Sequence, residues 1–143
     1  MYKHILIPTD GSSLSAKAID HGIALARAVG AKVTGITVTT PFHILAMEPG
    51  FVEDTPEEFR TRAIELGSGH LAKIRAAACG VECDVVQVEH EHPYRAIIDT
   101  AHSRGCDLIV MASHGRRGLS ALVLGSETVK VLTHSTIPVL VYR

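Results

Sequence analysis

The stretch Asp107-Leu108-Ile109-Val110-Met111-Ala112 is the most strongly apolar run in the sequence. A short apolar run of this kind is typical of a strand buried on both faces, as in a parallel sheet covered by helices. It is preceded by Gly105, which ends a helical segment, and is followed by a glycine- and serine-rich segment. Further short strands are expected on both sides of it, at residues 4–9, 32–39, 82–88 and 137–143. Alternating polar residues in the strand at 82–88 predict that it lies at an edge of the sheet.

Helical patterns fill the gaps between these strands. Apolar residues recur at helical spacing from Leu14 to Val29, and Gly30 follows as a helix stop. Thr55 and Pro56 are of the types preferred at a helix cap and at the first helical position. We expect helices at residues 14–29, 56–78, 93–104 and 126–134, a helix-capping turn at 10–13 and a looser connection at 40–54.

Strands and helices therefore alternate along the whole chain. This order predicts a single-domain α/β protein over residues 1–143, with a doubly wound, Rossmann-like parallel sheet of five strands and helices on both faces. The size agrees with this prediction, because 143 residues with 46% hydrophobic and 20% charged residues describe one globular domain.

Composition and charge argue against several classes of partner. The formal net charge is −1, so the chain has no basic excess to hold a nucleic-acid backbone. No apolar stretch approaches the roughly 18–20 residues that span a bilayer, and the apolar run at the N-terminus is too short for a signal peptide. Three cysteines, Cys79, Cys83 and Cys106, form an odd set without a CxxC pair. We interpret them as reduced and structural, which predicts a cytoplasmic protein. The net charge and the lack of a long apolar run predict that it has no nucleic-acid or membrane partner.

The segments that carry chemistry lie where the expected strands end. Ligands of doubly wound sheets bind beyond the carboxyl ends of the strands, where the strand order reverses, which indicates the segments after Thr9, Val38 and Met111. The last of these contains Gly115 and then Gly125-Ser126 at the start of a helix. Glycine lets backbone N–H groups approach an anion, and a helix start favours negative charge. The segment therefore predicts a phosphate site in which Ser126 caps the helix and offers its hydroxyl. A surface turn before an ordinary serine-capped helix accounts for the same residues.

Other motifs carry less weight. Asp10 follows the first strand, where it either caps the turn or accepts a hydrogen bond from a ligand and helps to hold Mg²⁺; both roles are compatible. The dinucleotide fingerprint G-x-G-x-x-A is matched by residues 67–72, but they lie inside a helical stretch. Residues 111–115 resemble part of a nucleophile elbow without a positioned acid and base. We interpret His90-Glu91-His92 as a solvated turn rather than a metal-binding pair.

In order and spacing, these segments resemble the universal stress protein family. Residues 112–126 are similar to that family's nucleotide signature, G-x2-G-x9-G-[ST], with Gly115 as the second glycine and Gly125-Ser126 as the closing pair. Ala112 stands in place of the first glycine. Residues 5–12 resemble the family's opening strand and turn, and residues 137–141 resemble its closing strand.

The resemblance implies a sheet order of 3-2-1-4-5, with strands numbered along the chain, a homodimer and, in one branch of the family, ATP binding. Matching by position gives a set of nucleotide-binding residues. By this match, Thr9 and Asp10 lie beside the base and the ribose. The backbone of Val38 contacts adenine, and Met111 and Ala112 flank the ribose. The phosphates are held by Gly115, Gly125, Ser126 and the backbone of Glu127. The remaining expected site residues are Pro8, His114, Arg116 and Thr128.

This resemblance implies a nucleotide-responsive regulatory protein of the stress response. It binds ATP or another adenine nucleotide, such as AMP, together with Mg²⁺, and it is not a dedicated enzyme because no positioned nucleophile or general base stands out. Dimerisation is expected through the strand at 137–143, since an open sheet edge invites pairing. Two alternatives stay open, a dimeric scaffold that does not bind nucleotide and a weak ATP hydrolase.

Overall fold

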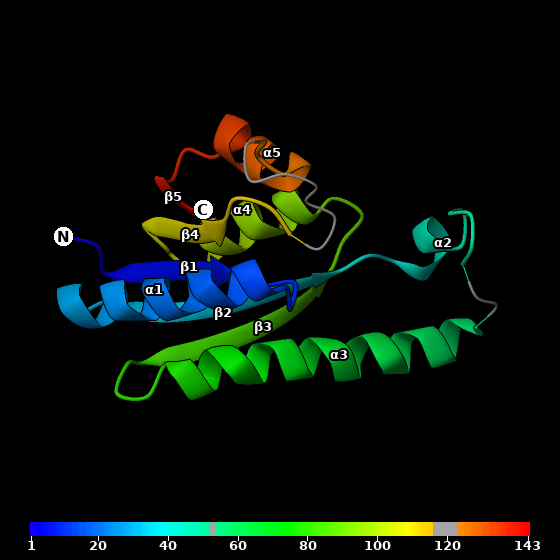
Figure 1. The fold of residues 1–143 in the computed structure, drawn as a ribbon, viewed down its shortest axis with the longest axis horizontal. Helices are drawn as coiled ribbons and strands as arrows, with labels where there is room; N and C mark the ends of the chain where they lie inside the picture. The colour runs from blue at the N-terminus through cyan, green and yellow to red at the C-terminus, as the bar shows by residue number, and fades with distance from the viewer. Residues whose placement is uncertain (52–53, 116–122) are drawn as a thin grey trace.

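The computed structural model describes residues 1–51, 54–115 and 123–143. Along these residues the elements are β1 (His4–Pro8), α1 (Ser13–Val29), β2 (Lys32–Thr39), α2 (Phe42–Leu45), α3 (Pro56–Ala77), β3 (Cys83–Glu89), α4 (Pro93–Ser103), β4 (Leu108–Ala112), α5 (Ser126–His134) and β5 (Val139–Tyr142). The strands form one parallel sheet in the order β3-β2-β1-β4-β5 (Figure 1). The predicted doubly wound sheet and its strand order are confirmed, and β3 lies at an edge as its polar pattern predicted.

Each face of the sheet is covered by its own pair of helices. Ile5 and Ile7 point to the face that α1 and α3 cover, whereas Leu6 between them points to the face under α4 and α5. This alternation follows from the strand geometry, which directs successive side chains to opposite faces. All residues of β4 are buried, as predicted for a strand covered on both faces.

Local capping signals begin α1 and α3, and end α1, where the sequence predicted. Ser12 caps α1, and Gly30 ends it in the left-handed conformation with φ of 72°. Thr55 and Glu58 form a reciprocal capping box at the start of α3, in which each side chain accepts a hydrogen bond from the other residue's backbone N–H. These bonds fix the entry of α3, the helix that borders the candidate site.

Two local predictions were wrong. Gly125, not Ser126, occupies the N-cap of α5, because the extended backbone at Gly125 (φ −61°, ψ 151°) precedes a helix that already includes Ser126. The connection predicted as loose at residues 40–54 contains the short helix α2. No side-chain cap bond marks the start of α2, so the sequence carries little local signal for it.

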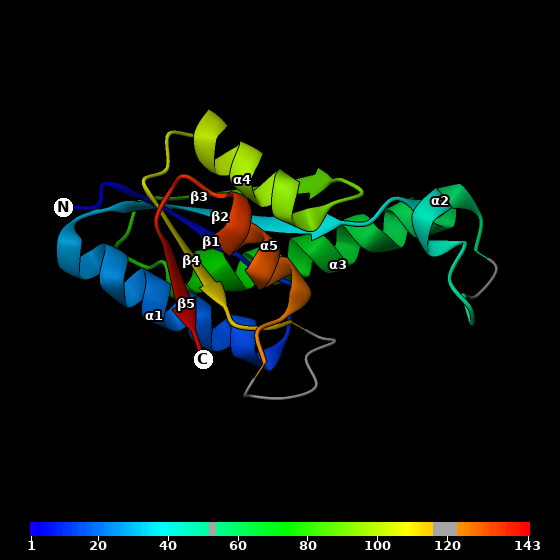
Figure 2. The same ribbon diagram turned by 90° about the horizontal axis from the view of Figure 1, so that it is seen from above.

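Residues 41–51, which we call the lobe, project beyond the sheet beside the N-terminal half of α3 (Figure 2). The lobe meets α3 through Phe42, Phe51 and Phe59, whose ring centroids lie 5.5 to 6.1 Å apart. These are the three phenylalanines of the sequence. A helix of four residues has little stability alone, so the lobe depends on this aromatic cluster for its position.

The cysteines are unpaired, as predicted: Cys79 is exposed, Cys83 is half-buried and Cys106 is buried. Among the described residues, no helix is both long and apolar enough to cross a membrane.

Candidate functional site

The turn after β1 is held rigidly by its own side chains. Asp10 Oδ1 accepts a hydrogen bond from the Ser12 N–H at 2.9 Å, and the Thr9 hydroxyl accepts one from the Gly11 N–H at 3.2 Å. From β2, the Thr37 hydroxyl donates to the Thr9 carbonyl at 2.8 Å. Gly11 has φ of 79°, which favours glycine. The turn thus presents Asp10 at the carboxyl end of the sheet in a fixed position.

The backbone of Val38 faces a gap in the sheet. Backbone groups of alternate β2 residues point toward β1: Lys32 N donates to Lys3 O at 3.0 Å, and Ile36 O accepts from Thr9 N at 2.8 Å. Val38 is the next member of this series, but the β1–β2 register ends at the pair Pro8 and Ile36. The N–H and C=O of Val38 therefore face the space beyond the end of β1, where a ligand can take the place of a neighbouring strand.

We call residues 112–126 the glycine segment. Backbone and side-chain hydrogen bonds bring its two ends together. Gly125 N donates to Ser113 O at 2.7 Å, and the Thr128 hydroxyl donates to Ala112 O at 3.0 Å. A Cβ at Gly125 would lie 3.0 Å from His114 Cα, so a side chain at this position requires a small shift of the backbone at His114. Ala112 is a buried residue with negative φ, so its methyl group causes no backbone strain.

Asp10 and Gly115 join the β1 turn to the β4 segment. A Cβ built at Gly115 would fall on Asp10 Oδ2, so only a glycine leaves room for the carboxylate in this position. Residues more than 100 positions apart in the sequence thus meet at the point where the strand order reverses between β1 and β4.

The carboxylate of Glu127 contacts one backbone N–H and one lysine. It accepts a hydrogen bond at 2.9 Å from Tyr94 N in the first turn of α4, and Lys130 Nζ lies 3.3 Å from its other oxygen. The N-terminus of α4 and the lysine offset its charge. Glu127 is therefore compatible with an anion near the start of α5.

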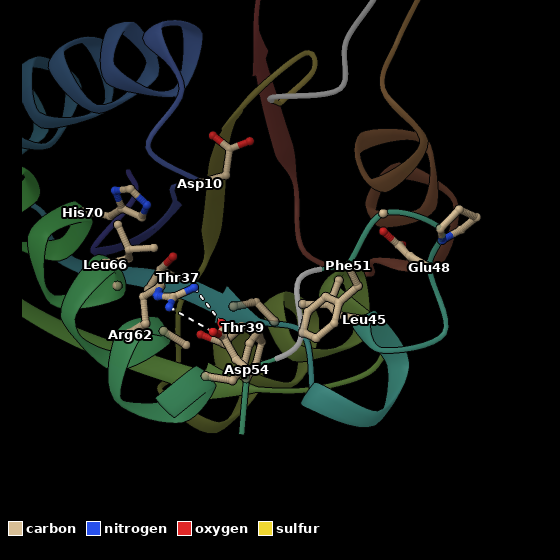
Figure 3. A pocket seen from close by; sticks show the side chains of 16 residues that line it. Asp10, Thr37, Thr39, Leu45, Glu48, Phe51, Asp54, Arg62, Leu66 and His70 are labelled. Carbon is tan, nitrogen blue, oxygen red and sulfur yellow. Dashed lines mark hydrogen bonds and ion pairs between the residues drawn. The ribbon is translucent and has the colours of Figure 1, made fainter. Parts of the chain in front are cut away.

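A cavity of about 560 Å³ adjoins Asp10 on the side of β2 and α3 (Figure 3). Asp10 and Val38 are the members of the predicted site that line it; Gly115, Gly125 and Ser126 lie outside its wall. Its volume falls within the range of small-molecule pockets. Asp10 lines the cavity and also contacts Gly115, so it connects the cavity with the glycine segment.

Helix α3 and the lobe supply cavity residues that the motifs did not indicate. The guanidinium of Arg62 donates to both carboxylate oxygens of Asp54, at 2.6 and 3.2 Å, and His70 lies directly against Gly11. The available signal was the helical spacing of Arg62, Leu66 and His70, which places them on one face of α3. That spacing does not reveal which part of the chain the face covers.

The remaining predicted residues are distributed over the same edge of the sheet. Pro8 is half-buried at the end of β1, His114 Nδ1 lies 3.2 Å from the Ser113 hydroxyl, and Ser126 is exposed at the start of α5. The Met111 side chain belongs to the buried cluster under α4 and α5, so its backbone is the part that faces the sheet edge. Arg116 lies outside the described residues.

Comparison with known proteins gives a consistent result. A model of the universal stress protein family matches residues 1–143. The universal stress protein YxiE of Bacillus subtilis is 30% identical over 151 residues, and the match covers 100% of each chain. The solved structure of MJ0577, a universal stress protein of Methanocaldococcus jannaschii, superposes with a TM-score of 0.83 at 29% identity and covers 99% of this chain and 96% of that one. A universal stress protein of Archaeoglobus fulgidus in complex with dAMP has a TM-score of 0.67 at 22% identity, over 99% of this chain and 98% of that one.

Proposed function

The chain belongs to the universal stress protein family, and from this premise we propose that it is a regulatory protein that binds ATP, with Mg²⁺, at the carboxyl edge of β1, β2 and β4. The observation that carries the proposal is the contact of the Asp10 turn with Gly115, beside a cavity that the backbone of Val38 faces. That arrangement offers an edge for a base on one side of Asp10 and a backbone cradle for phosphates on the other.

The base end of the proposed site is the cavity. Adenine presents a hydrogen-bond donor and an acceptor on adjacent atoms of its edge. The N–H and C=O of Val38 form a matching pair at the end of β1. The complex of the Archaeoglobus fulgidus relative with dAMP supports an adenine nucleotide as the ligand class.

The phosphate end of the proposed site is the start of α5. Its N-cap, Gly125, has no side chain to accept a hydrogen bond, and within the described part of the chain no side chain caps the helix, so its first N–H groups can bind an anion. The negative φ of Ala112 makes its methyl group compatible with binding although the family signature has glycine there. Asp10, in contact with Gly115, is placed to hold Mg²⁺ through its carboxylate, and the cation would neutralise phosphate charge.

A homodimer through β5 is the second part of the proposal. β5 is an edge strand, and Leu140 on it and Val129 and Leu132 on α5 are 41 to 44% exposed. Pairing two copies of β5 would satisfy the open edge and cover these side chains. A dimer is expected by light scattering at micromolar concentration. A strictly monomeric species there would contradict this part of the proposal.

Thermal unfolding with and without Mg-ATP tests nucleotide binding. At about 100 times the dissociation constant, ATP adds roughly 2.7 kcal/mol to the free energy of unfolding, a shift in Tm on the order of 8 °C. We expect the shift to vanish in the Gly115→Val, Gly125→Val double variant. Gly69→Val is the matched control, because a Cβ at this helical glycine would meet nothing within 4 Å apart from its chain neighbours and the backbone of its own helix.

The result also decides between the alternatives. No shift in a folded protein free of co-purified nucleotide would favour a dimeric scaffold that does not bind nucleotide. ATP turnover above background that is lost in Ser126→Ala would favour a weak hydrolase. A shift in Tm without turnover is the result expected for a nucleotide-responsive regulator.

A further inference from the structure

The cavity beside Asp10 has two walls of different origin. One wall is built by β2 and α3, with Thr39 and Arg62 among its residues. The lobe provides the other, through Leu45, Glu48 and Phe51 (Figure 3). Any ligand that fills this cavity therefore contacts the lobe and the body of the domain together.

Apart from its aromatic contacts with Phe59, the lobe has mainly short-range contacts. Its backbone bonds are local: Ala46 N donates to Phe42 O at 2.8 Å and Glu48 N donates to Leu45 O at 3.0 Å. A contact between His43 Nε2 and Glu91 Oε1, at 3.0 Å, links the lobe to the start of α4, and both side chains are at least half exposed. Short local bonds and few buried contacts place such a segment at the low end of local stability.

Resting on the nucleotide site proposed above, we propose that the lobe is the wall that recognises the nucleoside part of the ligand, and that its local stability therefore depends on the nucleoside rather than on the phosphates. Leu45, Phe51 and Phe59 give the cavity an apolar and aromatic lining that suits a planar base. At the same end, the paired Asp54 and Arg62 add carboxylate acceptors and guanidinium donors. The glycine segment lies outside this cavity, so in the proposed complex it contacts the phosphates and the lobe does not.

This division predicts that the nucleoside and the phosphates stabilise different segments of the protein. Adenosine alone binds in the cavity and stabilises residues 41–51. Tripolyphosphate with Mg²⁺ occupies the glycine segment and stabilises residues 113–115 and 123–128 without an effect on the lobe. ATP stabilises both regions.

Amide hydrogen exchange of the whole protein tests this inference, with separate samples containing Mg-ATP, adenosine, Mg-tripolyphosphate or no ligand. At about 100 times the dissociation constant, exchange of the lobe amides is expected to slow by up to about 100-fold with ATP and with adenosine, and to stay unchanged with tripolyphosphate. Protection at 113–115 and 123–128 by ATP without protection of the lobe would overturn the inference and leave the proposed nucleotide site standing. Protection of neither region by ATP would overturn both.

Two variants compare a lobe residue that lines the cavity with a lobe residue that does not. Phe51→Ala removes a ring from the cavity wall, and we expect it to weaken adenosine binding roughly tenfold or more while tripolyphosphate binding stays unchanged. Met47→Ala is the matched control, since Met47 is 83% exposed in the same lobe and does not line the cavity. Equal adenosine affinity for Phe51→Ala, Met47→Ala and the wild-type protein would overturn the assignment of the lobe to the nucleoside.

Discussion

Helix α3 packs closely on the sheet at one glycine, Gly35. The substitution Gly35→Ala, which adds a methyl group there, tests how this packing positions the helix that borders the cavity. Gly35 lies buried in β2 beneath Ile74 of α3. A Cβ at Gly35 would lie 2.6 Å from Ile74 Cδ1, 3.1 Å from Ile74 Cγ2 and 3.2 Å from Val85 Cγ1. Ile74 is fully buried, so Gly35→Ala forces it, and with it the helix that borders the cavity, away from the sheet.

Opposing terms set the size of this effect. Overpacking a well-packed core costs about 1–3 kcal/mol. Replacing glycine by alanine inside a strand returns roughly 0.5–1 kcal/mol. We therefore expect Gly35→Ala to lower the free energy of unfolding by about 1 kcal/mol. Ile74→Val, which deletes the methyl group closest to the new Cβ, costs about 0.5–1.5 kcal/mol by itself.

The two substitutions relieve one another, so the double variant is expected to be about 1 kcal/mol more stable than the sum of the single effects. Urea unfolding of the wild-type protein, both single variants and the double variant measures this coupling. Gly69→Ala is the control for the exchange of residue type, because its Cβ would meet nothing within 4 Å apart from its chain neighbours and the backbone of its own helix. For this variant we expect a gain of about 1 kcal/mol in the free energy of unfolding. Strict additivity in the cycle, or a Gly35→Ala variant as stable as the wild-type protein, would refute the packing argument.

Three further predictions concern ionisable groups. Burial, together with the charge of Lys32, lowers the pKa of His4 in the folded protein. As the pH falls below about 6.5, the unfolded chain therefore protonates at His4 before the folded protein does, and the free energy of unfolding decreases. Urea midpoints at several pH values should show this loss, at most about 1.4 kcal/mol per pH unit, and a His4→Gln variant with the same loss would contradict it. Burial raises the pKa of the Cys106 thiol to about 11, so mass spectrometry should find a thiol reagent on exposed Cys79 in the native protein and on Cys106 after unfolding; native labelling of both at one rate would count against this. Glu127→Ala removes the acceptor at the start of α4 and should lower the urea-derived free energy of unfolding by about 1 kcal/mol, whereas an unchanged value would show that water replaces the carboxylate at no cost.

Most of the fold was predictable because its signals are local. The apolar run of β4, the glycine after α1 and the cap at Thr55 each indicate an element from a few neighbouring residues. Alternation of strands and helices then leaves few ways to arrange a parallel sheet, since crossovers are right-handed. The helix α2 was missed because its position depends on contacts of Phe42 with Phe51 and Phe59, not on a local pattern.

The candidate site was predictable in part for the same reason. Val38 lies near the end of β2, Asp10 and Gly115 follow the ends of β1 and β4, and a parallel sheet brings such ends to one edge. The sequence carried no indication that Arg62 and His70 would border the same cavity, because helical spacing defines a face of α3 but not what that face meets. The N-cap of α5 was misplaced by one residue, since glycine and serine are both acceptable at that position.

By itself, then, the sequence determined the order and type of the main elements, the parallel sheet and the edge at which the carboxyl ends of its strands lie together. Those features depend on periodicity, caps and chain connectivity, which act over short stretches. Only the tertiary structure decided that Gly115 contacts the Asp10 carboxylate and that the backbone of Val38 faces the space beyond β1. It also decided that the lobe forms one wall of the cavity. These features depend on how closely distant segments approach one another, and that distance is fixed by side-chain volume at the contact rather than by any local pattern.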